Sequence, residues 1–144
     1  MFKTPDIRYK LFKTYCVVCY GSPLWDLSHV SIDDFCVAWR KCVRRVWSLP
    51  YRTHCRLLPI ICNDTSIITQ LQNRFLKFLQ TICMSDNMVL RLCSNLVLRG
   101  SGSAVSNNVS VICNALNADR AVWHAFRAEN NRTSALKIER KRSI

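Results

Sequence analysis

The stretch that decides the fold runs from Ser31 to Pro50 and reads SIDDFCVAWRKCVRRVWSLP. Its apolar residues recur at intervals of three and four positions, which places them on one face of a helix. They are Ile32, Phe35, Cys36, Trp39, Cys42, Val43, Val46 and Trp47. Ser31 is predicted to cap this helix, the following aspartates favour its first turn, and Pro50 is expected to stop it after Leu49.

The same helical spacing continues downstream. A second long helix is expected to begin at Asp64 or Thr65. Its apolar stripe consists of Ile67, Ile68, Leu71, Phe75, Phe78, Leu79 and Ile82. A third helix is predicted from Asn87 to Arg99, ended by Gly100. Weaker patterns predict helices at 103–116 and 119–128.

Two shorter segments lie upstream of these helices. Residues 10–20 fit either a short helix or a strand, ended by Gly21 and Pro23. Thr53 is expected to cap a short turn that Pro59 interrupts. Alternation of apolar and polar residues nowhere persists long enough to build a sheet. The sequence therefore predicts an all-α protein: a small bundle of about five helices over residues 8–128, with a disordered basic tail at 129–144.

Positive charge is the strongest functional signal. The chain of 144 residues carries 21 Lys and Arg against 9 Asp and Glu, a net charge of +12. No acidic residue lies between Phe35 and Asn63, where the basic residues are Arg40, Lys41, Arg44, Arg45, Arg52 and Arg56. Such a surface favours phosphate contacts with nucleic acid, the alternative being a solvated polar face. Trp39 and Trp47 could stack on bases, but their spacing places them in the core.

Catalytic and metal sites find little support in the sequence. Cys16 and Cys19 form a CxxC pair that His29, His54 and Cys55 could complete as a zinc site, but the apolar run around the pair favours packing. Asp33 and Asp34 open a helix and are interpreted as dipole-favoured residues, not as a two-metal pair. No nucleophile or phosphate-loop motif is present. We therefore expect no enzyme activity, no metal and no cofactor.

The cysteines and the N-terminus bear on the compartment. Nine cysteines, an odd number in mostly apolar settings, indicate reduced thiols. Residues 1–13 lack the apolar core of a signal peptide, and no apolar run approaches the length of a bilayer span. These features predict an intracellular protein, nuclear or cytoplasmic, that is neither secreted nor bound to a membrane.

Four ordered motifs carry a resemblance to a known family. They are YCVVCYGSPLWD at 15–26, AWRKCVRRVWSLPYRTH at 38–54, LLP at 57–59 and QLQNRFLKFL at 70–79. In this order they resemble the region downstream of the reverse transcriptase domain in jockey-like non-LTR (LINE-type) retrotransposon polyproteins of animals. The resemblance covers about Lys10 to Asn114.

The resemblance implies a helical, thumb-like segment over 8–128 that packs beside a template–primer duplex. Its basic helix matches Arg40, Lys41, Arg44, Arg45, Arg52 and His54 in this chain. The implied partner is RNA or an RNA–DNA duplex, bound weakly and without sequence specificity. Because the aromatic-Ala-Asp-Asp box of the polymerase is absent, we expect a truncated fragment without the catalytic core. The alternative is a non-functional structural remnant, or a helical protein-interaction module that self-associates through exposed apolar faces.

Overall fold

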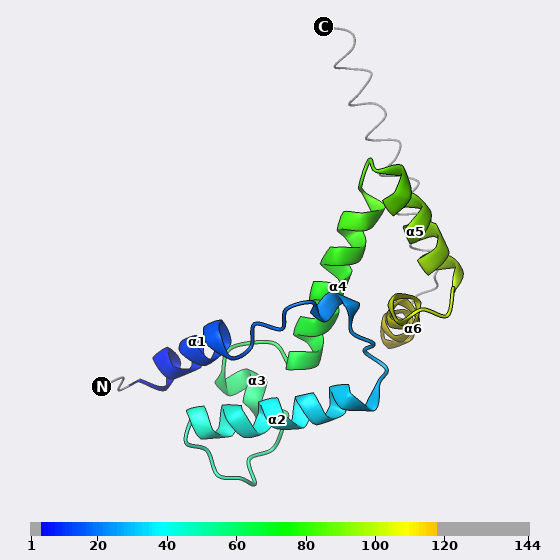
Figure 1. Cartoon of the computed structure of the whole chain (residues 1–144). Helices are drawn as coiled ribbons and strands as arrows, with labels where there is room; N and C mark the ends of the chain where they lie inside the picture. The colour runs from blue at the N-terminus through cyan, green and yellow to red at the C-terminus, as the bar shows by residue number, and fades with distance from the viewer. Residues whose placement is uncertain (1–3, 118–144) are drawn as a thin grey trace, which may run out of the picture. The chain divides into compact units, whose positions relative to one another are not determined.

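The structure is a computed structural model that describes residues 4–117. Within this range the chain is helical and contains no strand, which confirms the all-α prediction. The elements are α1 (Pro5–Tyr15), the 3-10 turn η1 (Ser22–Leu24), α2 (Val30–Val46), α3 (Leu57–Ile61), α4 (Ile67–Cys83), α5 (Met88–Arg99) and α6 (Ala104–Leu116) (Figure 1). The helix predicted at 119–128 and the tail predicted at 129–144 lie outside the described residues.

The described chain divides into two compact units. Unit 1 contains α1, α2, α3 and the start of α4, from residues up to Ser22 and from His29 to Arg74. Unit 2 contains Pro23–Ser28 and the chain from Phe75 onward, which brings in the rest of α4 with α5 and α6. All of the predicted basic residues from Arg40 to Arg56 belong to unit 1.

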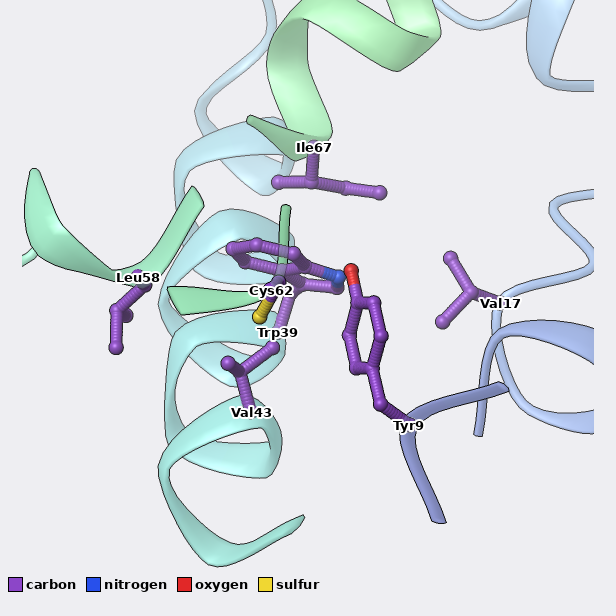
Figure 2. Packing of buried hydrophobic residues seen from close by; sticks show 7 residues of the cluster. All are labelled: Tyr9, Val17, Trp39, Val43, Leu58, Cys62 and Ile67. Carbon is purple, nitrogen blue, oxygen red and sulfur yellow. The ribbon is translucent and has the colours of Figure 1, made fainter. Parts of the chain in front are cut away.

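The core of unit 1 is built on the apolar face of α2. Trp39 and Val43 are buried there against residues from α1, α3 and the start of α4 (Figure 2). The buried cluster comprises Tyr9, Val17, Trp39, Val43, Leu58, Cys62 and Ile67. Trp47 packs partly buried against it, so the prediction that both tryptophans serve the core is confirmed. Each fully buried aliphatic side chain contributes about 1.5–3 kcal/mol to folding.

Both ends of α2 differ from the prediction. His29 is the N-cap, because its Nδ1 accepts the backbone N–H of Ser31 at 3.2 Å, so the prediction that Ser31 caps the helix is wrong. At the other end the helix stops at Val46, before Leu49. The backbone N–H groups of Ser48 and Leu49 donate to the carbonyls of Arg45 and Arg44, the paired bonds of a Schellman motif. Ser48, with φ of 53°, therefore ends α2 and Pro50 does not.

The structure also corrects the predictions for the shorter elements and for the start of α4. α1 begins at Pro5, where proline suits the first helical position, and it ends at Tyr15, so residues 16–20 are neither helix nor strand. Thr53 does not cap the next turn, since α3 begins after Arg56. Pro59 lies inside the first turn of α3, where its missing N–H costs no helical hydrogen bond. α4 begins after Ser66, whose Oγ accepts the Thr69 N–H, and not at Asp64 or Thr65.

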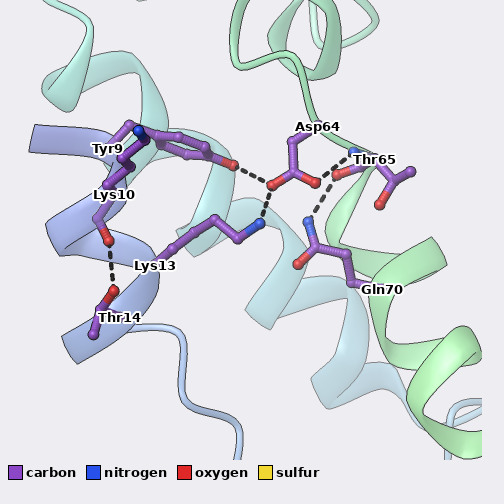
Figure 3. A network of polar contacts seen from close by, with 7 residues as sticks. All are labelled: Tyr9, Lys10, Lys13, Thr14, Asp64, Thr65 and Gln70. Atoms are coloured by element: carbon purple, nitrogen blue, oxygen red, sulfur yellow. Dashed lines mark hydrogen bonds and ion pairs between the residues drawn. The ribbon is translucent and has the colours of Figure 1, made fainter. Parts of the chain in front are cut away.

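A polar network ties α1 to the segment between α3 and α4. Asp64 Oδ2 accepts hydrogen bonds from Tyr9 Oη at 3.1 Å and from Lys13 Nζ at 2.5 Å (Figure 3). Its Oδ1 accepts the Thr65 N–H at 2.8 Å. Burial alone would raise the pKa of the Asp64 carboxyl, but the bonds from Lys13, Thr65 and Tyr9 outweigh it and lower that pKa. Asp64 is thus a structural acid.

Unit 2 closely matches the predicted helices. α5 covers the range predicted from Asn87 to Arg99, with Asn87 as its N-cap, and Gly100 in the left-handed conformation ends it as predicted. α6, with Ser103 as its N-cap, matches the helix predicted at 103–116. Asn108 on α6 is fully buried. Its Oδ1 accepts the Leu27 N–H at 2.7 Å and its Nδ2 donates to the Trp25 carbonyl at 2.6 Å. This one amide therefore fixes the Pro23–Ser28 segment to α6.

Candidate nucleic-acid interface

The loop between α2 and α3 folds back onto the polar side of α2. Arg44 holds it there: its Nε and Nη2 donate to the Thr53 carbonyl at 3.3 and 2.9 Å. Thr53 in turn donates from its N–H and its Oγ1 to the Pro50 carbonyl. The guanidinium of Arg44 also lies 6.0 Å from the centre of the Tyr51 ring, within cation–π range. Arg44 is therefore a positioning residue for the loop.

The returned loop and α2 enclose an open hollow of about 370 Å³, here called the basic hollow. It is lined by Val37, Arg40, Lys41, Arg44, Tyr51, Arg52, Thr53, His54 and Cys55. Among these described residues none is acidic. The structure thus brings five of the predicted residues around one concave surface: Arg40, Lys41, Arg44, Arg52 and His54.

The other two predicted residues lie elsewhere. Arg56 lines a neighbouring pocket that shares Arg40 and Cys55 with the basic hollow. Arg45 is exposed and lines neither of these cavities. It follows Arg44 directly, and one step along an α-helix turns the side chain by about 100°. The linear run of charge is therefore split by the helix into separate surfaces.

The cationic side chains of the basic hollow differ in their exposure to solvent and in their hydrogen bonds. Arg44 and Arg40 are half-buried, and Arg40 Nε donates to the Cys36 carbonyl at 3.1 Å. Lys41, Arg52 and His54 are exposed. His54 Nδ1 accepts the Arg56 N–H at 3.2 Å, which leaves Nε2 as the nitrogen that can face a ligand. The exposed cations can meet phosphates at once, whereas Arg40 and Arg44 also hold the protein together.

Two further residues that line the hollow, Tyr51 and Cys55, were not among the contact residues predicted from the sequence. Tyr51 is 79% exposed and stands beside Arg44, so its ring is open to stacking. Its position in a basic loop was an available signal. Cys55 is exposed, and Arg44 Nη2 lies 3.5 Å from its Sγ. Hydrogen bonding to Arg40 lowers the pKa of the Cys55 thiol most, burial raises it by less, and the Arg44 hydrogen bond and the charges of both arginines lower it further.

The positions of the cysteines and histidines bear on the predicted alternatives of a zinc site and of core packing. Among the described residues no three His, Cys, Asp or Glu side chains come together in a metal-ligating arrangement. All nine cysteines are free. Cys16 is exposed, so the packing interpretation is wrong for it, whereas the half-buried Cys19 does pack against the unit 1 core. The course of the chain through residues 16–20 brings Cys19 to this core.

None of the described helices has the length and apolar composition needed to cross a bilayer. No protein-family model, no curated protein and no solved structure matches the chain.

Proposed function

We propose that this chain binds nucleic acid through phosphate contacts in the basic hollow, weakly and without sequence specificity. The observation that carries the proposal is the gathering of Arg40, Lys41, Arg44 and Arg52 around one concave, acid-free surface in unit 1. Cations that neutralise phosphates release counterions from the nucleic acid, so the affinity comes from electrostatics and is independent of sequence. The net charge of +12 strengthens the same attraction at long range.

The preferred nucleic acid is proposed to be RNA or an RNA–DNA duplex. This choice rests on the resemblance of residues 10–114 to the segment that follows the polymerase domain in LINE-type retrotransposons. On this proposal the chain is a non-enzymatic helical segment of retroelement origin. Its role is to hold a template–primer duplex, and the chemistry of polymerisation belongs to residues that this chain lacks.

Salt dependence tests the proposal directly. The affinity for an RNA–DNA duplex, measured by fluorescence anisotropy, should fall with rising salt. Four arginine and lysine contacts predict a slope of about −4 in a plot of log K against log salt. The paired variant Lys41→Glu with Arg52→Glu should weaken binding to all sequences alike and make the slope less steep by about two. Both side chains are exposed, so the fold should persist.

Arg45→Glu is the matched control, because it reverses an exposed charge on the same helix outside the hollow. It should weaken binding much less than either Lys41→Glu or Arg52→Glu alone. Equal losses at all three positions would remove the hollow as the contact surface. Absence of binding by the wild-type chain at low salt would refute the function itself.

A second candidate function is protein interaction through α5. Met88, Val89, Leu92 and Leu96 each expose more than half of their surface, and they include an i, i+4, i+8 row on this helix. An exposed apolar row favours self-association or docking of another helix. Sedimentation of the wild-type chain over rising concentration tests it: a dimer that Leu92→Glu dissociates supports this function, and a monomer throughout counts against self-association.

A further inference from the structure

A second cavity adjoins the basic hollow and has a different chemistry. It encloses about 520 Å³ and lies between α2, the start of α3 and the start of α4, all within unit 1. We call it the side pocket. It shares Arg40 and Cys55 with the basic hollow, so the two cavities border each other at these residues. Its volume is in the range of pockets that enclose small organic molecules.

The walls of the side pocket are mainly apolar. The indole of Trp39 and the side chains of Pro59, Ile67 and Ile68 line it. Ile68 and Pro59 are only half-buried, which leaves apolar surface open to an occupant, whereas Trp39 is 5% exposed. The flat face of a nucleobase gains by leaving water for apolar walls of this kind. A phosphate alone would gain nothing from these walls.

Charged groups stand around the same pocket. Arg40 and Arg56 both line it, and the first turn of α4 begins there at Ile67. Backbone N–H groups at a helix start add to the attraction that the two arginines exert on an anion. Asp33 supplies one carboxylate on α2, which can accept a hydrogen bond from an amino group or a ring N–H. Apolar walls with an anion-binding rim and one acceptor fit a nucleotide.

From this arrangement we propose that the side pocket holds one unpaired nucleotide of a strand whose neighbouring phosphates lie in the basic hollow. The inference rests on the proposed nucleic-acid function and names its substrate class: a duplex with a single-stranded overhang, in preference to a blunt duplex. Arg40 stands at the junction and contacts the phosphate between the last paired nucleotide and the first unpaired one. The base of the unpaired nucleotide lies against Ile68 and Pro59, and Arg56 contacts the phosphate beyond it.

The first experiment compares two RNA–DNA duplexes of equal paired length, one blunt and one with a three-nucleotide overhang. The overhang should be bound about tenfold more tightly, the gain expected when about 55 Å² of apolar surface leaves water. A 2-aminopurine at the first unpaired position should change its fluorescence on binding, because its base leaves water for the pocket. If both duplexes bind equally and the fluorescence is unchanged, the side-pocket inference is wrong while the proposed function stands. If neither duplex binds, the proposed function fails.

Two variants separate the pocket from the hollow. Ile68→Trp fills the side pocket and should abolish the preference for the overhang while leaving affinity for the blunt duplex unchanged. Ile60→Trp makes the same change at a residue of α3 that is 73% exposed and does not line the pocket, and it should leave the preference intact. Melting temperatures of both variants report on folding. Preference for the overhang that survives in a folded Ile68→Trp protein would overturn the inference.

A variant at the rim of the side pocket tests the inference if Ile68→Trp does not fold. Arg56→Gln changes an exposed side chain that lines the side pocket and not the basic hollow. It should reduce the overhang preference at least threefold and diminish the 2-aminopurine signal, with blunt-duplex affinity nearly unchanged. An equal loss for both duplexes would assign Arg56 to the general electrostatic surface and would contradict its place at the rim of a nucleotide pocket.

Discussion

Cys55 shows how two neighbouring cations change the chemistry of a single side chain. It is an exposed thiol in the α2–α3 loop, and the guanidinium groups of Arg40 and Arg44 stand beside its sulfur. Positive charge and hydrogen-bond donors favour the thiolate over the thiol. Since the thiolate is the reactive form, a lowered pKa makes more of it available at neutral pH. Cys55 should therefore be the most reactive cysteine in the chain.

Alkylation with iodoacetamide, followed by mass spectrometry of peptides over a series of pH values, measures this reactivity. The rate at Cys55 should reach half its plateau at a lower pH than the rate of an ordinary thiol, because the pKa of Cys55 is lowered. In Arg40→Gln the midpoint for Cys55 should move up, because the residue that most lowers the pKa is gone. An unchanged midpoint in that variant would contradict the assigned cause.

At the scale of this residue, the sequence predicted the charges but not their effect on the thiol. Arg40 and Arg44 are 15 and 11 positions from Cys55, and only the return of the loop brings them together. That return depends on one backbone carbonyl, the Thr53 oxygen that Arg44 binds. A carbonyl exists at every position of the chain, so no residue type signals which one a guanidinium will bind.

Among the elements, α2 shows which features a sequence pattern determines. Its apolar face sets the body of the helix and its buried residues, and the structure confirms both. The position of each end depends on which of several nearby residues caps the helix. His29 and not Ser31 caps the start, and Ser48 ends the helix two residues before Pro50. α5 and α6 were predicted to within one residue at each end, because Gly100 lies between them and readily adopts the left-handed conformation that ends α5.

The left-handed backbone of Ser48 gives a prediction about the stability of α2. A residue with a Cβ pays a steric cost in this conformation that glycine avoids, although glycine loses more entropy on folding. Ser48→Gly should therefore raise the free energy of unfolding by about 0.5 kcal/mol, and Ser48→Val should lower it by about 1–2 kcal/mol. Urea denaturation followed by circular dichroism measures both.

Pro50→Ala is the control for this pair. Because the Schellman bonds of Ser48 and Leu49 already end the helix, loss of the proline should change stability by less than about 0.5 kcal/mol and add no helical residues. The assignment of the helix end to Ser48 would be wrong if Ser48→Gly destabilised as much as Ser48→Val. A longer α2 in Pro50→Ala would return the stop signal to the proline.

In the molecule as a whole, the two candidate binding cavities and the buried clamp on Asn108 lie in different units. The basic hollow and the side pocket are both lined by unit 1 residues alone. The buried polar clamp of Asn108 on Leu27 and Trp25 lies within unit 2. Hydrophobic periodicity predicted the longer helices α2, α4, α5 and α6, but it could not predict this division. Pro23–Ser28 joins unit 2 through hydrogen bonds to a residue more than 80 positions away, which local patterns do not encode.

The clamp allows the coupling of the two units to be tested. Asn108→Ala removes both hydrogen bonds, leaves the Leu27 N–H without its Asn108 partner, and opens a small cavity. The cost should be about 2–4 kcal/mol of the stability of unit 2. Because every partner of Asn108 lies in unit 2, hydrogen exchange of backbone amides should quicken in α6, while exchange in the middle of α2 should change little. Asn107→Ala, at an exposed position of the same helix, is the control and should leave both patterns unchanged. Equal acceleration in α2 and α6 would show that the chain opens as one cooperative body. In that case a change in unit 2 would also weaken the proposed binding of nucleic acid at the basic hollow. If the two units open separately, Asn108→Ala should bind the RNA–DNA duplex as the wild-type chain does.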